Sequence, residues 1–111
     1  MEANAYQRLA VNTAIYPDDQ AVVYPILGLC GEAGEVAEKI KKVLRSGRTF
    51  PFGATGDERV ELLKELGDVQ WYIANLANDL GFTLEDVMSR NLAKLGDRAQ
   101  RGVIEGSGDN R

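Results

Sequence analysis

The segments GEAGEV (residues 31–36) and KELGDV (residues 64–69) decide how this chain folds. Both follow the order acid, any residue, glycine, acid, valine. The four acids are Glu32, Glu35, Glu65 and Asp68. Because acids three residues apart lie on one face of a helix, each segment places its two carboxylates together. Two such helices facing each other would gather four oxygen-rich groups, the kind of site that hard divalent cations bind.

Apolar residues recur at helical spacing around both segments, and the two rows correspond at an offset of 33 residues. With residues about 100° apart, Glu32 falls roughly 80° from the middle of its apolar stripe and Glu35 roughly 140°. Glu65 and Asp68 take roughly the same two offsets on the second helix. We therefore expect Glu32 and Glu65 to be half sheltered, Glu35 and Asp68 to point further out, and all four to meet where two antiparallel helices cross.

Single acids on a helix surface usually do no more than solvate it, and Glu35 has Lys39 four residues on for an ordinary ion pair. Clustered carboxylates, in contrast, repel one another unless a cation neutralises them, so the matched set favours a metal site. Gly34 and Gly67 lie at equivalent mid-helix positions, where each glycine costs about 1 kcal/mol relative to alanine. This pairing predicts a close approach by backbone or ligand.

The periodicity predicts an all-α fold of the four-helix-bundle type, with no sheet. The expected helices span residues 3–14, 25–45, 57–80 and 83–98. Thr55 with Glu58, and Thr83 with Asp86, have the spacing of residues that cap a helix N-terminus, and Gly81 is a C-terminal signal. Residues 47–56 form a loop with glycines and a proline. We expect one domain over residues 1–100 and a glycine-rich tail over residues 101–111 that is flexible or closes over the site.

Composition excludes several classes of function. A net charge of −4 leaves no basic field to attract nucleic acid. The chain has no run of about 18 apolar residues and no signal-peptide pattern at residues 1–10, so we expect a cytoplasmic protein without a membrane partner. The absence of histidine excludes histidine-based catalysis and the Glu-x-x-His di-iron motif. Cys30, the only cysteine, reads as a small core residue.

The last expected helix carries polar residues of a different kind. Asn91, Lys94 and Arg98 follow one flank of its apolar stripe at spacing i, i+3, i+7. The stems of such border residues can pack while their charged heads reach outward. Alone they are ordinary border residues, but beside a metal-loaded acidic site they are what a polyphosphate needs.

These motifs resemble the signature of the MazG-like, all-α nucleoside triphosphate pyrophosphohydrolases. The match consists of E-x-x-E (residues 32–35), E-x-x-D (residues 65–68), the flanking glycines and the later N-x-x-K (residues 91–94). It covers nearly the whole chain, from YQRLA (residues 6–10) to the tail. The resemblance implies hydrolysis of NTPs or dNTPs to the monophosphate and pyrophosphate, with Mg²⁺ as the usual metal and Mn²⁺ as a possible substitute. It also implies a compact helical bundle that assembles into a homodimer or homotetramer.

The resemblance assigns roles to seven residues. The implied metal ligands are Glu32, Glu35, Glu65 and Asp68, and the implied phosphate-binding residues are Asn91, Lys94 and Arg98. Glu32 or Glu35 is the candidate to take a proton from the attacking water. The insertion at residues 47–56 departs from the family pattern and leaves the selected base open. Two other functions also stay open: a non-catalytic helical oligomerisation module, and a sister pyrophosphohydrolase of phosphoribosyl-ATP or a modified dNTP.

Overall fold

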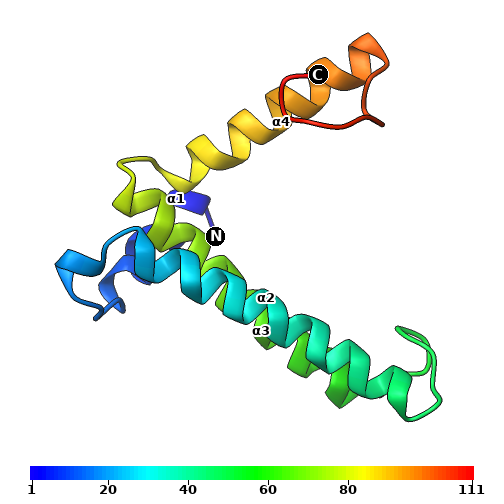
Figure 1. Ribbon diagram of the computed structural model, residues 1–111. Coiled ribbons are helices and arrows are strands. Elements are labelled where there is room, and N and C mark those ends of the chain that lie inside the picture. The colour runs from blue at the N-terminus through cyan, green and yellow to red at the C-terminus, as the bar shows by residue number, and fades with distance from the viewer.

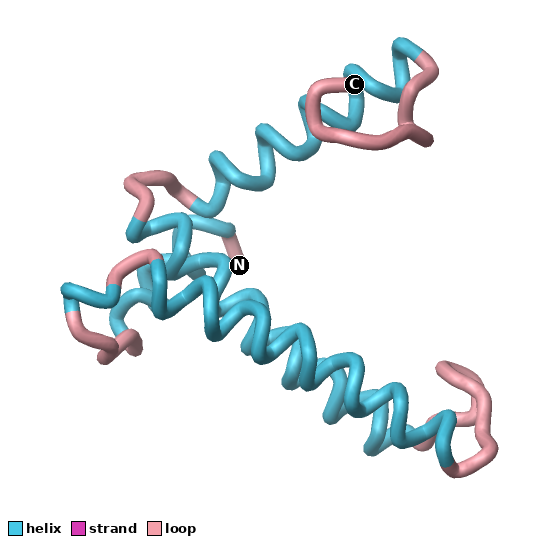
Figure 2. The backbone as a smooth tube through the Cα atoms, in the orientation of Figure 1, coloured by secondary structure: helices cyan, strands magenta, loops and turns pink.

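The computed structural model describes residues 1–111, which form helices and no strands (Figures 1 and 2). The elements are α1 (Ala3–Asn12), the short 3₁₀ helix η1 (Asp18–Gln20), α2 (Val23–Arg45), α3 (Gly56–Asp79) and α4 (Leu84–Arg101). The predicted all-α class is confirmed. Each predicted helix is present, with ends displaced by at most three residues. None of the helices combines the length and apolar character that crossing a membrane requires.

Local capping chemistry places the helix ends where the sequence predicts them. At the start of α3 the Glu58 amide donates to the Thr55 hydroxyl at 3.1 Å, and the Thr55 amide donates to the Glu58 carboxylate at 2.9 Å. Thr83 and Asp86 form the same reciprocal pair at the start of α4, at 3.0 and 2.9 Å. After α3 the chain turns at Gly81, whose φ of +83° is left-handed and favours glycine.

The helices α2 and α3 form a long antiparallel hairpin, called the hairpin below (Figure 1). Gly28 of α2 lets the two helices approach closely, because a Cβ atom added there would lie 2.1 Å from Cε1 of Tyr72. At the tip, Arg48 donates to the Glu58 carboxylate at 2.9 Å and ties the loop to the first turn of α3. The hairpin is therefore a rigid scaffold for side chains along its length.

A small core joins the base of the hairpin to α1 and the start of α4. Ala10, Ala74 and Leu84 pack together there. The buried Gln7 side chain donates to the carbonyls of Ala74 and Phe82, both at 3.1 Å, and accepts from the Leu84 amide at 3.0 Å. These bonds satisfy backbone groups at the turn into α4 and set the direction in which α4 leaves.

Beyond this core α4 diverges from the hairpin (Figure 1). The radius of gyration is 16.9 Å, compared with about 13 Å for a compact chain of about 100 residues. Only ten of the 111 residues are buried, so the bundle implied by the resemblance is not closed within one chain. Apolar side chains along α4 are instead exposed; they include Val87, Met88, Leu92 and Leu95.

The prediction for Cys30 is wrong, because its side chain is exposed. A closed bundle would cover α2 from more than one side. Here only α3 packs along the length of α2. The helical spacing that placed Cys30 in an apolar row was correct, but that part of α2 has no covering helix in this chain.

Candidate metal and phosphate site

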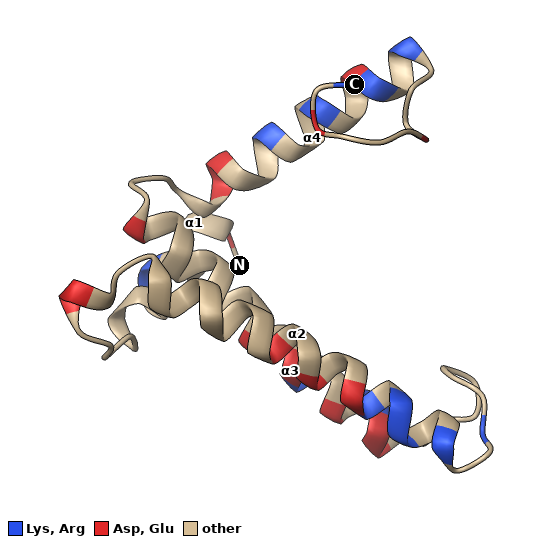
Figure 3. Cartoon of the chain, viewed as in Figure 1, with Lys and Arg blue, Asp and Glu red and all other residues tan.

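Three of the four predicted acids meet halfway along the hairpin. Glu32 of α2 faces Glu65 and Asp68 of α3, and one carboxylate oxygen from each lies within 4.8 Å of the others. Glu35 lies outside this group, although its negative charge contributes to raising the pKa of Glu32. Figure 3 shows the acidic residues in the middle of the two helices. The three carboxylates that meet are called the acidic cluster below.

The exposures of the acids follow the helical phase predicted for them. Glu32 and Glu65 are half-buried, whereas Glu35 and Asp68 are exposed. The half-buried pair lies at the edge of the contact between α2 and α3, where the apolar stripes end. The assignment of all four acids as metal ligands stays a prediction.

The electrostatics of the acidic cluster favour a bound cation. Burial raises the pKa of Glu32, and the Glu65 carboxyl group and the charge of Asp68 raise it further. Like charges held this close destabilise one another, and a divalent cation relieves the repulsion. Carboxylate oxygens are hard donors that suit Mg²⁺ and Mn²⁺. The donor set therefore fits either ion.

Lys39 reaches the cluster from α2. Its Nζ atom lies 3.5 Å from Oε1 of Glu65 on α3. The sequence offered Glu35 as an ordinary i, i+4 partner for Lys39, but no such ion pair forms. The half-buried Glu65 carboxylate on the neighbouring helix is the partner instead. Lys39 therefore contacts the acidic cluster, which was not predicted from the sequence.

Two tyrosines also adjoin the acids. Burial raises the pKa of Tyr6, and the charge of Asp68 raises it further. Burial likewise raises the pKa of Tyr72, with Tyr24 and Glu32 adding to the effect. Both hydroxyl groups therefore stay protonated at neutral pH. Tyr72 lies four residues after Asp68 on the same helical face, a spacing that could have identified it from the sequence.

The paired glycines have no close neighbours in this chain. A Cβ atom added at Gly34 or Gly67 would meet nothing within 4 Å. The predicted close approach by backbone is therefore not found within the protomer, where it occurs at Gly28 instead. The alternative, approach by a ligand, stays a prediction.

The predicted phosphate-binding residues belong to α4, a helix that lies apart from the middle of α2 and α3 (Figure 3). Asn91 is exposed, and Lys94 pairs with Asp109 at 3.1 Å. Arg98 is buried, with 4% of its surface exposed. No hydrogen bond or ion pair joins these residues to the acids. One chain thus brings three acids together and holds the cations elsewhere.

The fold and site define an all-α protein with an acidic cluster on a helical hairpin and a separate helix that carries Lys94 and Arg98. The sequence profile of the MazG nucleotide pyrophosphohydrolase domain matches residues 24–103, and the chain belongs to this family. The matched range is most of the chain and contains all seven predicted site residues. Membership supports a nucleotide pyrophosphohydrolase activity in general terms.

Two relatives cover much or all of the chain. The Gene 37 protein of Mycobacterium phage L5 is 48% identical over the whole of both chains. The Uncharacterized protein YvdC of Bacillus subtilis (strain 168) is 38% identical over 63% of this chain and 68% of that protein. Neither name states a substrate or a metal. No solved structure matches the chain.

Proposed function

We propose that this protein hydrolyses nucleoside or deoxynucleoside triphosphates to the monophosphate and pyrophosphate in a Mg²⁺-dependent reaction. The observation that carries the proposal is the convergence of Glu32, Glu65 and Asp68, whose oxygens lie within 4.8 Å of one another. Membership of the MazG family supports a nucleotide as substrate. Mn²⁺, which accepts the same oxygen donors, is expected to replace Mg²⁺.

In this proposal Glu32, Glu65 and Asp68 hold the metal, and Glu35, one turn from Glu32, is the fourth ligand. When bound, the metal neutralises phosphate charge and polarises phosphorus–oxygen bonds. Glu32 or Glu35 takes the proton of the water that attacks the α-phosphorus. The bond between the α-phosphorus and the oxygen that bridges it to the β-phosphate breaks, and pyrophosphate leaves with that oxygen. Lys39 limits the excess negative charge on the cluster through Glu65.

The cations of α4 complete the site from a second copy of the chain. Within one chain α4 diverges from the hairpin, so Asn91, Lys94 and Arg98 do not reach the acids of their own protomer (Figure 3). The exposed apolar residues of α4 form a contiguous face typical of a subunit interface. The acidic cluster of one copy and the Lys94 and Arg98 side chains of another carry opposite charges, and this complementarity favours pairing between copies. A homodimer is the smallest assembly that satisfies this arrangement, and a homotetramer can be built from two of them.

Pyrophosphate release tests the proposed reaction. The wild-type protein should release pyrophosphate from at least one common or modified NTP or dNTP with Mg²⁺ or Mn²⁺, and none after chelation by EDTA. Glu35→Gln and Asp68→Asn should each abolish this activity while the helical circular dichroism spectrum is unchanged. Glu61→Gln is the matched control, because Glu61 lies on α3, as Asp68 does, and pairs with Lys64 outside the acidic cluster. Near-normal turnover in both site variants would rule out the proposed site.

Thermal melting separates an enzyme from a non-catalytic oligomerisation module. A ligand that binds only the folded state raises the melting temperature. Mg²⁺ together with a nucleotide should therefore stabilise the wild-type protein and leave Asp68→Asn unchanged. An oligomerisation module would melt at the same temperature with or without them. Including phosphoribosyl-ATP in the substrate screen tests the sister activity.

A further inference from the structure

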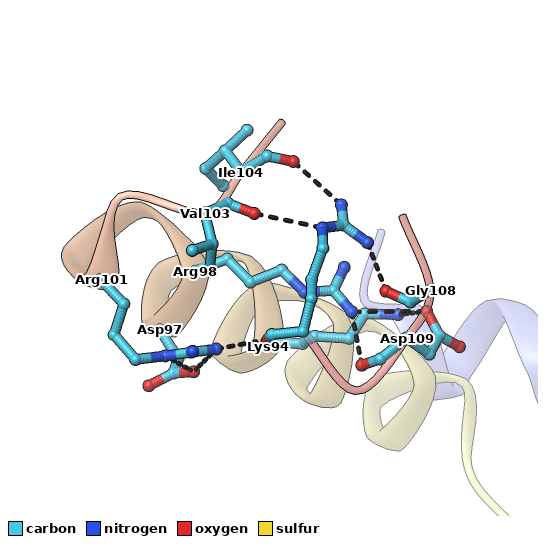
Figure 4. A network of polar contacts seen from close by, with 9 residues as sticks. Lys94, Asp97, Arg98, Arg101, Val103, Ile104, Gly108 and Asp109 are labelled. Atoms are coloured by element: carbon cyan, nitrogen blue, oxygen red, sulfur yellow. Dashed lines mark hydrogen bonds and ion pairs between the residues drawn. The ribbon is translucent and has the colours of Figure 1, made fainter. Parts of the chain in front are cut away.

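Residues 102–111 fold back along α4 in a compact turn, called the hook below (Figure 4). Arg111 holds it together: its guanidinium group donates to the carbonyls of Val103 at 3.1 Å and Ile104 at 2.9 Å, and also to the carbonyl of Gly108. A Cβ atom added at Gly106 would lie 2.6 Å from Cδ of Arg111, so the Arg111 side chain would have to move. The hook is thus a defined structure in spite of its glycine-rich composition.

The hook places one carboxylate against two of the cations of α4, Lys94 and Arg98 (Figure 4). Oδ1 of Asp109 accepts from Lys94 Nζ at 3.1 Å and lies 3.5 Å from Nη2 of Arg98. The same Arg98 nitrogen donates to the Asp109 backbone carbonyl at 2.6 Å. Lys94 holds the pKa of Asp109 below its usual range, with Arg98 adding to the effect. The carboxylate therefore stays charged at neutral pH.

This contact leaves little of Arg98 accessible to another anion. The Arg98 side chain is 5% exposed, whereas that of Asp109 is 82% exposed. Lys94 keeps more of its surface, at 39%, but its charge is already neutralised. A phosphate could take the place of the carboxylate, because Lys and Arg bind both anions through the same charge-assisted hydrogen bonds.

We propose that the hook is an internal occupant of the phosphate-binding position on α4, in which the Asp109 carboxylate stands where a phosphate of the substrate or of pyrophosphate binds. This inference rests on the proposed function, which assigns Lys94 and Arg98 to the phosphate chain. Binding of the triphosphate displaces Asp109 and exposes Arg98. Release of pyrophosphate lets the carboxylate return, so the hook favours product departure.

The hook weakens phosphate binding without abolishing it. Exposed ion pairs of this kind are worth little, and a triphosphate or pyrophosphate carries several charges against the single charge of Asp109. The apparent dissociation constant for the phosphate ligand equals the intrinsic constant divided by the fraction of molecules in which the hook is open. Asp109→Asn should remove this effect and leave the fold intact, since its side chain is mostly exposed.

The experiment measures pyrophosphate binding to the full chain by isothermal titration calorimetry in the presence of Mg²⁺. Asp109→Asn should lower the dissociation constant about three- to fivefold, the size expected for one exposed ion pair. Asp97→Asn is the matched control, because it removes the same charge from α4 but faces Arg101. Gly106→Ala opens the hook by a different route, through the clash with Arg111, and should tighten binding in the same way.

Two results would overturn the proposal. Unchanged pyrophosphate affinity in Asp109→Asn and Gly106→Ala would mean that the hook occupies no phosphate position. Weaker affinity would mean that Asp109 instead positions Lys94 for the phosphate. The titration needs no turnover, so it separates this inference from the reaction: a wild-type protein that binds pyrophosphate but hydrolyses no nucleotide refutes the proposed function alone. Where turnover is found, KM should fall in Asp109→Asn, and inhibition by the product pyrophosphate should become stronger.

Discussion

The hairpin and α4 contribute to the proposed site in opposite ways. The acidic cluster is assembled within one chain, because α2 and α3 pack side by side and fix where Glu32, Glu65 and Asp68 meet. Lys94 and Arg98 are held away from it, on a helix whose apolar face is exposed, and both cations pair with Asp109 of the hook. In the proposed site, the metal half would be formed by folding of one chain and the phosphate half would require assembly with a second.

The largest expected effect comes from removing a cation that lies far from the acids of its own chain. Lys94→Ala should reduce kcat/KM about 100-fold, the size typical of losing one charge-stabilising group in an active site. Lys41→Ala removes the same charge from α2, where it pairs with Glu38, and should have little effect. Steady-state kinetics on both variants makes the measurement. Equal activity in the two variants would mean that α4 does not contribute to the site, which would contradict the proposed division between the hairpin and α4.

A smaller effect is expected on the stability of the acidic half. The pKa of Glu32 is raised in the folded state above its ordinary value of 4.5. Between pH 4.5 and the folded pKa, the folded protein therefore binds more protons than the unfolded protein. The stability that this carboxyl contributes is present below pH 4.5 and is lost as the pH rises through the folded pKa. In metal-free buffer at pH 7.5, Glu32→Gln should therefore melt about 2 °C above wild type. At pH 4 the two should melt together.

Glu61→Gln sharpens this test. Glu61 lies on α3, one turn before Glu65 of the acidic cluster. Lys64 holds the pKa of Glu61 below its usual range, so replacing Glu61 with glutamine should not stabilise the protein. Added Mg²⁺ should narrow the difference between Glu32→Gln and wild type by relieving the repulsion. Melting of Glu32→Gln at or below wild type in metal-free buffer would show that the clustered charges do not strain the fold.

The smallest effect is expected at the tip of the hairpin, away from both halves. Arg48 lowers the pKa of Glu58 to about 2, with the Thr55 amide adding to the effect. The stability that Glu58 contributes is present above pH 4.5 and is lost as the pH falls towards 2. Glu58→Gln should therefore melt slightly below wild type at pH 7, and the difference should disappear in acid. Turnover should not change, and a loss of activity would extend the site to the tip.

The parts that the sequence predicted correctly are those set by neighbours along the chain. Thr55 and Thr83 cap their helices through residues three positions on, and Gly81 ends α3 through its own backbone freedom. The relative exposure of Glu32 and Glu35 followed from helical phase alone. Each of these features depends on spacings that the sequence displays directly.

The parts that the sequence did not predict depend on packing between distant segments. Lys39 pairs across the hairpin with Glu65 because that carboxylate is half-buried, and spacing within α2 cannot show it. Cys30 is exposed because only α3 packs along the length of α2, which the spacing within α2 cannot show. Arg98 is buried against the hook, whose glycine-rich composition predicted a tail that is flexible or closes over the site.

The measurement that tests the shared site most directly is complementation between two inactive variants. Asp68→Asn keeps α4 intact and Lys94→Ala keeps the acidic cluster intact, so a mixed dimer contains one site in which both halves are wild type. Co-expressed and purified together, the pair should recover about a quarter of wild-type activity, since half of the dimers are mixed and each has one working site. If mass spectrometry shows mixed dimers and their turnover is no higher than that of either variant alone, the two halves of the site do not come from different copies.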